Sequence, residues 1–246
     1  MLKAFILGLI AGLALLLGAI FGLVFKPSKK IASLIMAFGS GVLISALAFD
    51  LMEDAYLKGG IIPISLGVLL GAGVFVFGDY LLGKRGGHYR KHLKIERSGY
   101  SGEANSMAIA MGALLDGIPE SAMIGIGLLT GGSTGILMFS AVFLSNIPEG
   151  ISGVFGISHA KKTRRFIFTL WILIALVCGL AALIGFKFLA SSSGATLALV
   201  SAVAAGSILA MISDTMIPEA FEEGGVFVAL STVCGFLSAF IISRLS

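Results

Sequence analysis

The chain has 246 residues, of which 57% are apolar and 12% are charged. Soluble domains carry about 25% charged residues, so this composition excludes an ordinary soluble domain and predicts a polytopic membrane protein. The net charge is +4, but the basic residues lie in short loops between apolar segments, which argues against nucleic-acid binding. Cys178 and Cys234 form no CxxC pair, and we interpret both as small buried apolar residues.

Eight segments are long and apolar enough to cross a bilayer as helices, which requires about 20 residues each. The predicted spans cover residues 4–25, 31–57, 61–83, 105–129, 134–159, 166–189, 195–221 and 225–244. The first follows Lys3 but is longer than a usual signal core and lacks a clear cleavage site, so it is kept as a span. We therefore expect an all-α protein with a single transmembrane domain.

The distribution of Lys and Arg predicts the orientation, because cytoplasmic loops are enriched in both residues. Thirteen of the 17 basic residues lie in the loops after spans 1, 3 and 5. The prediction is a cell (inner) membrane protein with both termini external. The longest loop, residues 84–104, is then cytoplasmic. His88 and His92 lie in it, and we interpret them as bystanders, with transient metal contact as the alternative.

Two internal matches predict an inverted repeat. Residues 49–60 (FDLMEDAYLKGG) match residues 214–225 (DTMIPEAFEEGG) at an offset of 165, and residues 116–121 (DGIPES) match residues 145–150 (SNIPEG) at an offset of 29. The paired spans run in opposite directions. The expected layout is three spans, two central spans and three spans, an arrangement typical of transporters with a midplane binding site.

The two Pro-Glu motifs place carboxylates in the middle of spans 4 and 5. A charge at that depth costs roughly 2.5–3.5 kcal/mol, and residues 105–159 contain no Lys or Arg. Each proline also disrupts the helix hydrogen bond of the carbonyl four residues earlier, at Leu115 and Leu144. Helical spacing puts the polar residues of each motif on one face. The candidate ligands of a divalent cation are Asp116, Glu120, Ser145, Asn146 and Glu149.

The oxygen atoms of these side chains favour hard ions such as Mg²⁺ or Mn²⁺. Further acids suggest a route across the bilayer. Asp50 and Glu53 fall in the outer half of span 2, and Asp214 and Glu219 in the inner half of span 7. We expect the first pair to help the ion reach the site and the second pair to help it leave.

The paired motifs, together with Pro218-Glu-Ala220, resemble the ZIP family of divalent metal transporters. The resemblance covers most of the chain and implies zinc, iron or manganese import, with Co²⁺, Cd²⁺ and Mg²⁺ also open. It further implies a homodimer and a movement of spans 1, 4, 5 and 6 against the others. Asp116 and Ser145 stand where the family commonly has histidines, and residues 166–186 lack the acid that many members carry on span 6.

Two other readings stay open beside this non-enzymatic transporter. A transporter core that has lost its histidines and its span 6 acid could be a metal-binding membrane protein without flux. An intramembrane hydrolase is the less favoured alternative. It would use pairs of acids such as Asp50, Asp116 or Asp214, with Phe77-Gly-Asp-Tyr80 as a faint protease-like motif.

Overall fold

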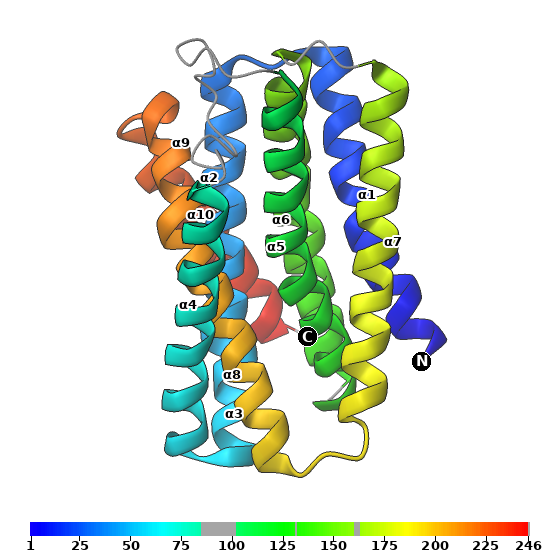
Figure 1. Ribbon diagram of the computed structural model, residues 1–246. Helices are drawn as coiled ribbons and strands as arrows, with labels where there is room; N and C mark the ends of the chain where they lie inside the picture. Colours follow the sequence, from blue (N-terminus) through cyan, green and yellow to red (C-terminus); the bar gives the residue numbers. More distant parts are fainter. Residues whose placement is uncertain (85–101, 131, 160–162, 246) are drawn as a thin grey trace.

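The computed structural model describes residues 1–84, 102–130, 132–159 and 163–245, and this part of the chain is helical without a strand (Figure 1). The all-α prediction is confirmed for these residues. The elements are α1 (Leu2–Phe25), α2 (Lys29–Ala46), η1 (Leu47–Leu51), α3 (Met52–Gly59), α4 (Ile61–Lys84), α5 (Gly102–Thr130), α6 (Gly132–His159), α7 (Arg164–Leu189), α8 (Gly194–Met211), η4 (Ile212–Met216), α9 (Ile217–Gly224) and α10 (Phe227–Leu245).

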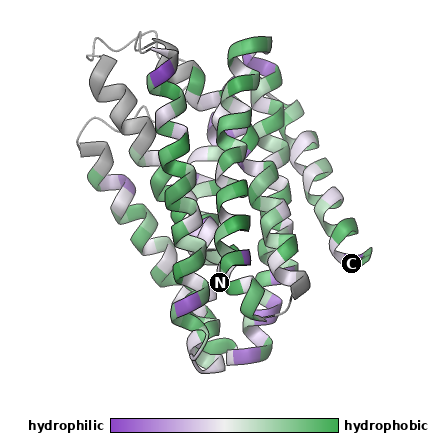
Figure 2. Ribbon diagram, turned by 90° about the vertical axis from the view of Figure 1, so that its right-hand side faces the viewer, coloured by the Kyte–Doolittle hydropathy of each residue, from purple (hydrophilic) through white to green (hydrophobic). Residues whose placement is uncertain are grey.

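The described residues form eight helical spans of sufficient length and hydropathy to cross a membrane, as predicted. Two of them are composite: α2, η1 and α3 make one span, and α8, η4 and α9 make another. Apolar residues dominate along the helices, and the strongest hydrophilic colour lies near the two ends of the bundle (Figure 2). Both chain termini lie in the lower half of Figure 1.

Hydroxyl side chains start three of these helices. The side chains of Ser28, Thr163 and Ser193 accept hydrogen bonds from the backbone N–H three residues later, at Ile31, Phe166 and Thr196. Such caps satisfy one of the four backbone donors that a helix start leaves unpaired. Polar turns therefore define the beginning of these spans, although their interiors are almost uniformly apolar.

The spans pack in two groups of four. In the first group, α1 and α5 contact each other and both contact α6 and α7. In the second group, α2 packs with α10, and both α3 and α4 pack with α8. The two groups meet where α2 packs on α6 and α5 packs on α8. This spatial grouping does not follow chain order, and the three-two-three arrangement stays a prediction.

Glycines allow the closest helix contacts. A Cβ at Gly18 of α1 would clash with the carbonyl oxygen of Ile147 in α6, and one at Gly150 of α6 would clash with that of Leu15 in α1. Small residues at helix interfaces let backbones approach in lipid, where packing replaces the hydrophobic effect as the source of association. Contact between α1 and α6 holds the second Pro-Glu motif in place, because Ile147 and Gly150 belong to it.

The two composite spans share the same bounds when they are shifted by the predicted offset of 165 residues. The π-helical segments are Leu47–Leu51 and Ile212–Met216, and the helices before and after them correspond end to end. Each span then ends at a glycine with positive φ, 73° at Gly60 and 59° at Gly225. A conformation in this region favours glycine because it lacks a Cβ. The local match between residues 49–60 and 214–225 therefore reflects a structural correspondence.

Candidate metal site

The polar residues of the two Pro-Glu motifs are buried in the first group of helices. The exposed fractions are 1% for Asp116 and 0% for Glu120 on α5, and 0%, 1% and 5% for Ser145, Asn146 and Glu149 on α6. Both helices continue through their prolines, Pro119 and Pro148. Neither helix is interrupted at its proline, so the polar side chains of each motif lie on one continuous helix.

Glu120 and Glu149 lie on two helices that pack against each other, α5 and α6. The carboxylates of both lie within electrostatic range of the Cys178 thiol on α7, and Cys178 itself is fully buried. Its Sγ donates to the carbonyl oxygen of Gly117 at 3.8 Å, one residue after Asp116. The site is therefore built from α5, α6 and α7 together.

Asn146 links this site to α1. Its Nδ2 donates a hydrogen bond of 2.9 Å to the carbonyl oxygen of Ala11, a residue of α1 that lies 135 positions away in the sequence. Its Oδ1 is buried and has no hydrogen-bond partner within the described part of the chain. A buried acceptor of this kind costs about 1–3 kcal/mol unless something donates to it or it binds a cation. The amide oxygen is thus available as a ligand atom.

The hydroxyl of Ser145 is oriented by its own helix. Its Oγ donates to the carbonyl oxygen of Val142 at 3.0 Å, which leaves the lone pairs of the oxygen as acceptors. A Cβ built on Gly39 of α2 would lie 3.2 Å from the Cα of Ser145. This side of the site is therefore closed by the second group of helices.

Among the described residues, no three His, Cys, Asp or Glu side chains stand close enough together to hold a metal ion. The expected meeting of three carboxylates is therefore not found among these residues. A bound ion would complete its shell with Asn146 Oδ1, the Ser145 hydroxyl or water.

Two adjoining cavities lie between α2, α6 and α10. A polar cavity of about 260 Å³ is lined by Asp50, Glu53, Asp54 and Arg244 among others. An apolar cavity of about 220 Å³ continues from it, shares Asp50 and Leu137 with it, and reaches Leu144, next to Ser145. The apolar cavity thus extends from Asp50 to the residue before the α6 motif.

The acids predicted as a pathway differ in their surroundings. Asp50 is half-buried on η1 and accepts a 2.5 Å hydrogen bond from Ser243, whereas Glu53 is exposed and lies 3.7 Å from Arg244. On the second composite span, Asp214 is exposed on η4 and Glu219 is 8% exposed on α9. The structure thus places one of each pair in the interior and one at the surface.

Cys178 is the site residue that sequence reasoning missed. It was expected only to fill space, and the signal that could have identified it is a cysteine in the middle of a span that lacks acids. Cys234 was expected to be buried and is exposed. The reason is that α10 is only 11% buried in its most apolar stretch. His88 and His92 lie outside the described residues.

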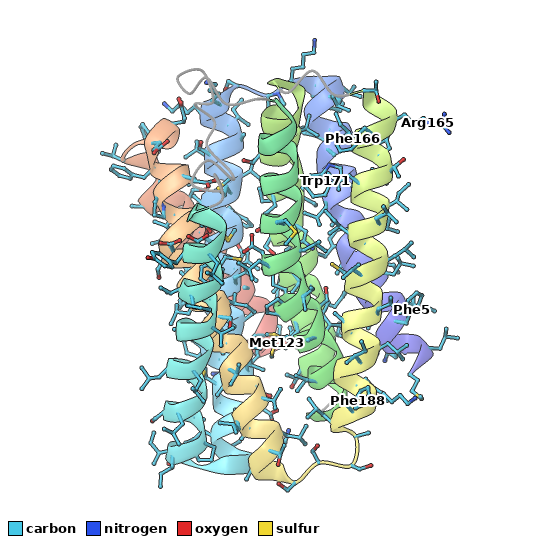
Figure 3. All side chains as sticks on the ribbon, viewed as in Figure 1. Phe5, Met123, Arg165, Phe166, Trp171 and Phe188 are labelled. Carbon is cyan, nitrogen blue, oxygen red and sulfur yellow. The ribbon has the colours of Figure 1, made fainter. Side chains whose placement is uncertain are left out.

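The side chains of α7 show how this helix is fixed against the site. Arg165 and Phe188 lie at the two ends of α7, and Trp171 lies between them (Figure 3). Met123, on the neighbouring helix α5, lies at a level between Trp171 and Phe188. Trp171 and Met123 are 1% and 0% exposed. Trp171 packs in one cluster with Cys178, Ile174 and Leu15, so the turn that carries the thiol is held by large apolar side chains.

Comparison with known proteins gives no family for this chain. A scan against protein-family models found no match, and a search of curated proteins found none either.

Proposed function

We propose that this protein is a secondary transporter that moves a divalent metal cation, zinc or a related ion such as manganese or iron, towards the cytoplasm. The observation that carries the proposal is the burial of Glu120 and Glu149, at 0% and 5% exposure, on two helices that pack against each other, α5 and α6. Intramembrane acids that face the interior of a helix bundle typically mark ion or proton routes. The resemblance of the motifs to the ZIP family supports the same function.

In this proposal Glu120 and Glu149 are the principal ligands. Asp116, Ser145 and Asn146 complete the shell with water, and the Oδ1 of Asn146 is the acceptor already available for it. Oxygen donors of this kind suit dications. Asp50 and Glu53, which line the polar cavity, attract the ion from outside. Asp214 and Glu219 assist its departure.

The four-and-four packing of the helices suggests how the ion crosses. The ligand-bearing helices α5 and α6 belong with α1 and α7, and this group meets the other mainly along α2–α6 and α5–α8. A sliding of one group past the other would carry the site across the bilayer. The end with Lys26, Lys29 and Lys30 would face the cytoplasm. The exposed helices α4 and α10 would contact lipid or a second copy of the chain.

The test is metal flux into liposomes, measured for Zn²⁺, Mn²⁺, Fe²⁺, Co²⁺, Cd²⁺ and Mg²⁺ at two pH values. Glu120→Ala and Glu149→Ala should each abolish flux, whereas Glu223→Gln, outside the candidate site, should keep it. Equal reconstitution of all variants is the control. Unchanged flux in both alanine variants would reject the ligand assignment, and binding without flux in the unmodified protein would favour a non-transporting metal-binding protein.

A further inference from the structure

Cys178 of α7 brings a sulfur atom to the first Pro-Glu motif. Its Sγ lies against the turn of α5 between Asp116 and Glu120, 3.8 Å from the carbonyl oxygen of Gly117. A Cβ at position 117 would come within 3.1 Å of that sulfur. A glycine at this position therefore gives the thiol direct access to the backbone of the Pro-Glu motif.

A second feature points to a ligand at the same place. The α1 turn at Ala11 and Gly12 contacts both Asn146 and Cys178. Ala11 accepts the hydrogen bond from Asn146 Nδ2, and a Cβ at Gly12 would lie 3.0 Å from the Cβ of Cys178. The unpartnered Oδ1 of Asn146, 1% exposed, is thus held on the turn that also packs on the cysteine. An amide oxygen of one Pro-Glu motif and a thiol that contacts the other motif are therefore joined through one turn of α1.

We propose that Cys178 is a metal ligand and that it gives the site a preference for thiophilic dications, Zn²⁺ and Cd²⁺, over Mn²⁺ and Mg²⁺. The inference rests on the proposed function and specifies the ion for the same site. Thiolate donors favour Zn²⁺ and softer ions, whereas carboxylate and carbonyl oxygens alone favour Mg²⁺ and Mn²⁺. The thiol proton is released to a carboxylate or to water as the metal–sulfur bond forms.

A mixed site would have to be assembled from three helices as the ion enters. No set of three His, Cys, Asp or Glu side chains is preassembled in the described residues. The cation would draw the thiolate and one or both glutamates towards the amide oxygen, which is fixed by its bond to α1. Four donors of this type satisfy the tetrahedral shell that Zn²⁺ adopts with sulfur, nitrogen and oxygen ligands.

The experiment uses the full chain in detergent with Cys234→Ser as the background, because Cys234 is exposed and would bind Cd²⁺ on its own. Cd²⁺ is titrated while the ultraviolet thiolate-to-cadmium charge-transfer band is recorded. The band should grow with one equivalent of metal in the background protein and be absent in Cys178→Ser. The Cd²⁺ and Zn²⁺ affinities of Cys178→Ser should fall at least about tenfold, the lower end of the losses typical for altered metal-site partners, and Mn²⁺ affinity should change little.

The outcomes separate this inference from the proposed function. Stoichiometric Cd²⁺ binding that needs Glu120 and Glu149 but gives no thiolate band overturns the role of Cys178 and leaves the transporter proposal intact. Absence of any dication binding in the background protein overturns both. Mn²⁺ binding and the melting temperature of Cys178→Ser serve as folding controls. Cys178→Ala, which fills similar volume without a donor atom, should lose the band and the Cd²⁺ preference in the same way.

Discussion

The nitrogen and the oxygen of the Asn146 side-chain amide have different surroundings. The Nδ2 end ties α6 to α1 through Ala11, and the Oδ1 end stays available in the interior. Hydrogen bonds between membrane helices contribute on average about 0.6 kcal/mol and at most about 1.7 kcal/mol. The hydrogen bond to Ala11 should therefore contribute little to stability. A substitution of Asn146 should act mainly through the loss of a metal ligand.

We expect Asn146→Ala to lower the free energy of unfolding by about 1 kcal/mol. The free energy of metal binding should fall by more than this amount. Thermal unfolding in detergent, with and without Zn²⁺, measures both. Ser238→Ala is the matched control, because Ser238 donates only to the carbonyl oxygen of Cys234 in its own helix. A variant that loses stability but binds Zn²⁺ normally would assign Asn146 a structural role alone.

At the scale of elements, the glycines decide which helices touch. Gly18 and Gly22 on α1 face α6, and Gly67 and Gly71 on α4 face α8. The small-xxx-small spacings of the sequence are thus used within the chain, in the way that such spacings bring membrane helices together. A surface for a second copy would have to lie elsewhere, on faces such as those of α4 and α10 that point outward.

Gly18→Ala should destabilise the protein by roughly 1–3 kcal/mol, the usual effect of adding atoms to a packed interior. The added Cβ would meet the carbonyl oxygen of Ile147, so α1 must move away from α6. Gly73→Ala on α4 is the control, because a Cβ built there lies more than 4 Å from every described residue beyond its own stretch of helix. Melting temperatures of the two variants give the comparison, and equal stability would contradict the close contact between α1 and α6.

On the scale of the whole molecule, the cavities lie at the boundary between the two helix groups. Val42 of α2 and Ala141 of α6 line opposite walls of the apolar cavity. They are buried, with 2% and 3% exposure. If the groups slide during transport, this boundary must change, because packed interfaces switch between discrete arrangements and do not deform continuously.

A covalent cross-link between α2 and α6 tests whether the two helix groups slide past each other during transport. Val42→Cys and Ala141→Cys, combined and linked by a short bifunctional thiol reagent, should stop flux while metal binding persists. Each single variant treated with the same reagent should retain flux, and reduction of a cleavable linker should restore it. Full transport by the cross-linked protein, with the cross-link verified by mass spectrometry, would show that α2 and α6 do not separate.

Particular residues show how far the sequence reached. The proposed ligands Glu120 and Glu149 were identifiable because a carboxylate after a proline in a long apolar run is conspicuous, and their burial is as expected. The mutual distance of the carboxylates was not predictable, because it depends on how far α5 and α6 rotate about their axes. Cys178 was overlooked for the same reason: span 6 reads as uniformly apolar, and only its packing on Gly117 reveals its surroundings.

The sequence by itself determined the number and type of the spans, because a bilayer requires about 20 apolar residues with internally satisfied backbone groups. It also indicated the correspondence of residues 49–60 with 214–225, because local chemistry repeats there. Only the tertiary structure decided which helix faces meet within the two groups of spans, that Cys178 of α7 packs against Gly117 of the first Pro-Glu motif, and that Asn146 is anchored to α1. These arrangements depend on glycine contacts and helix rotations between segments far apart in the chain, which no local pattern encodes.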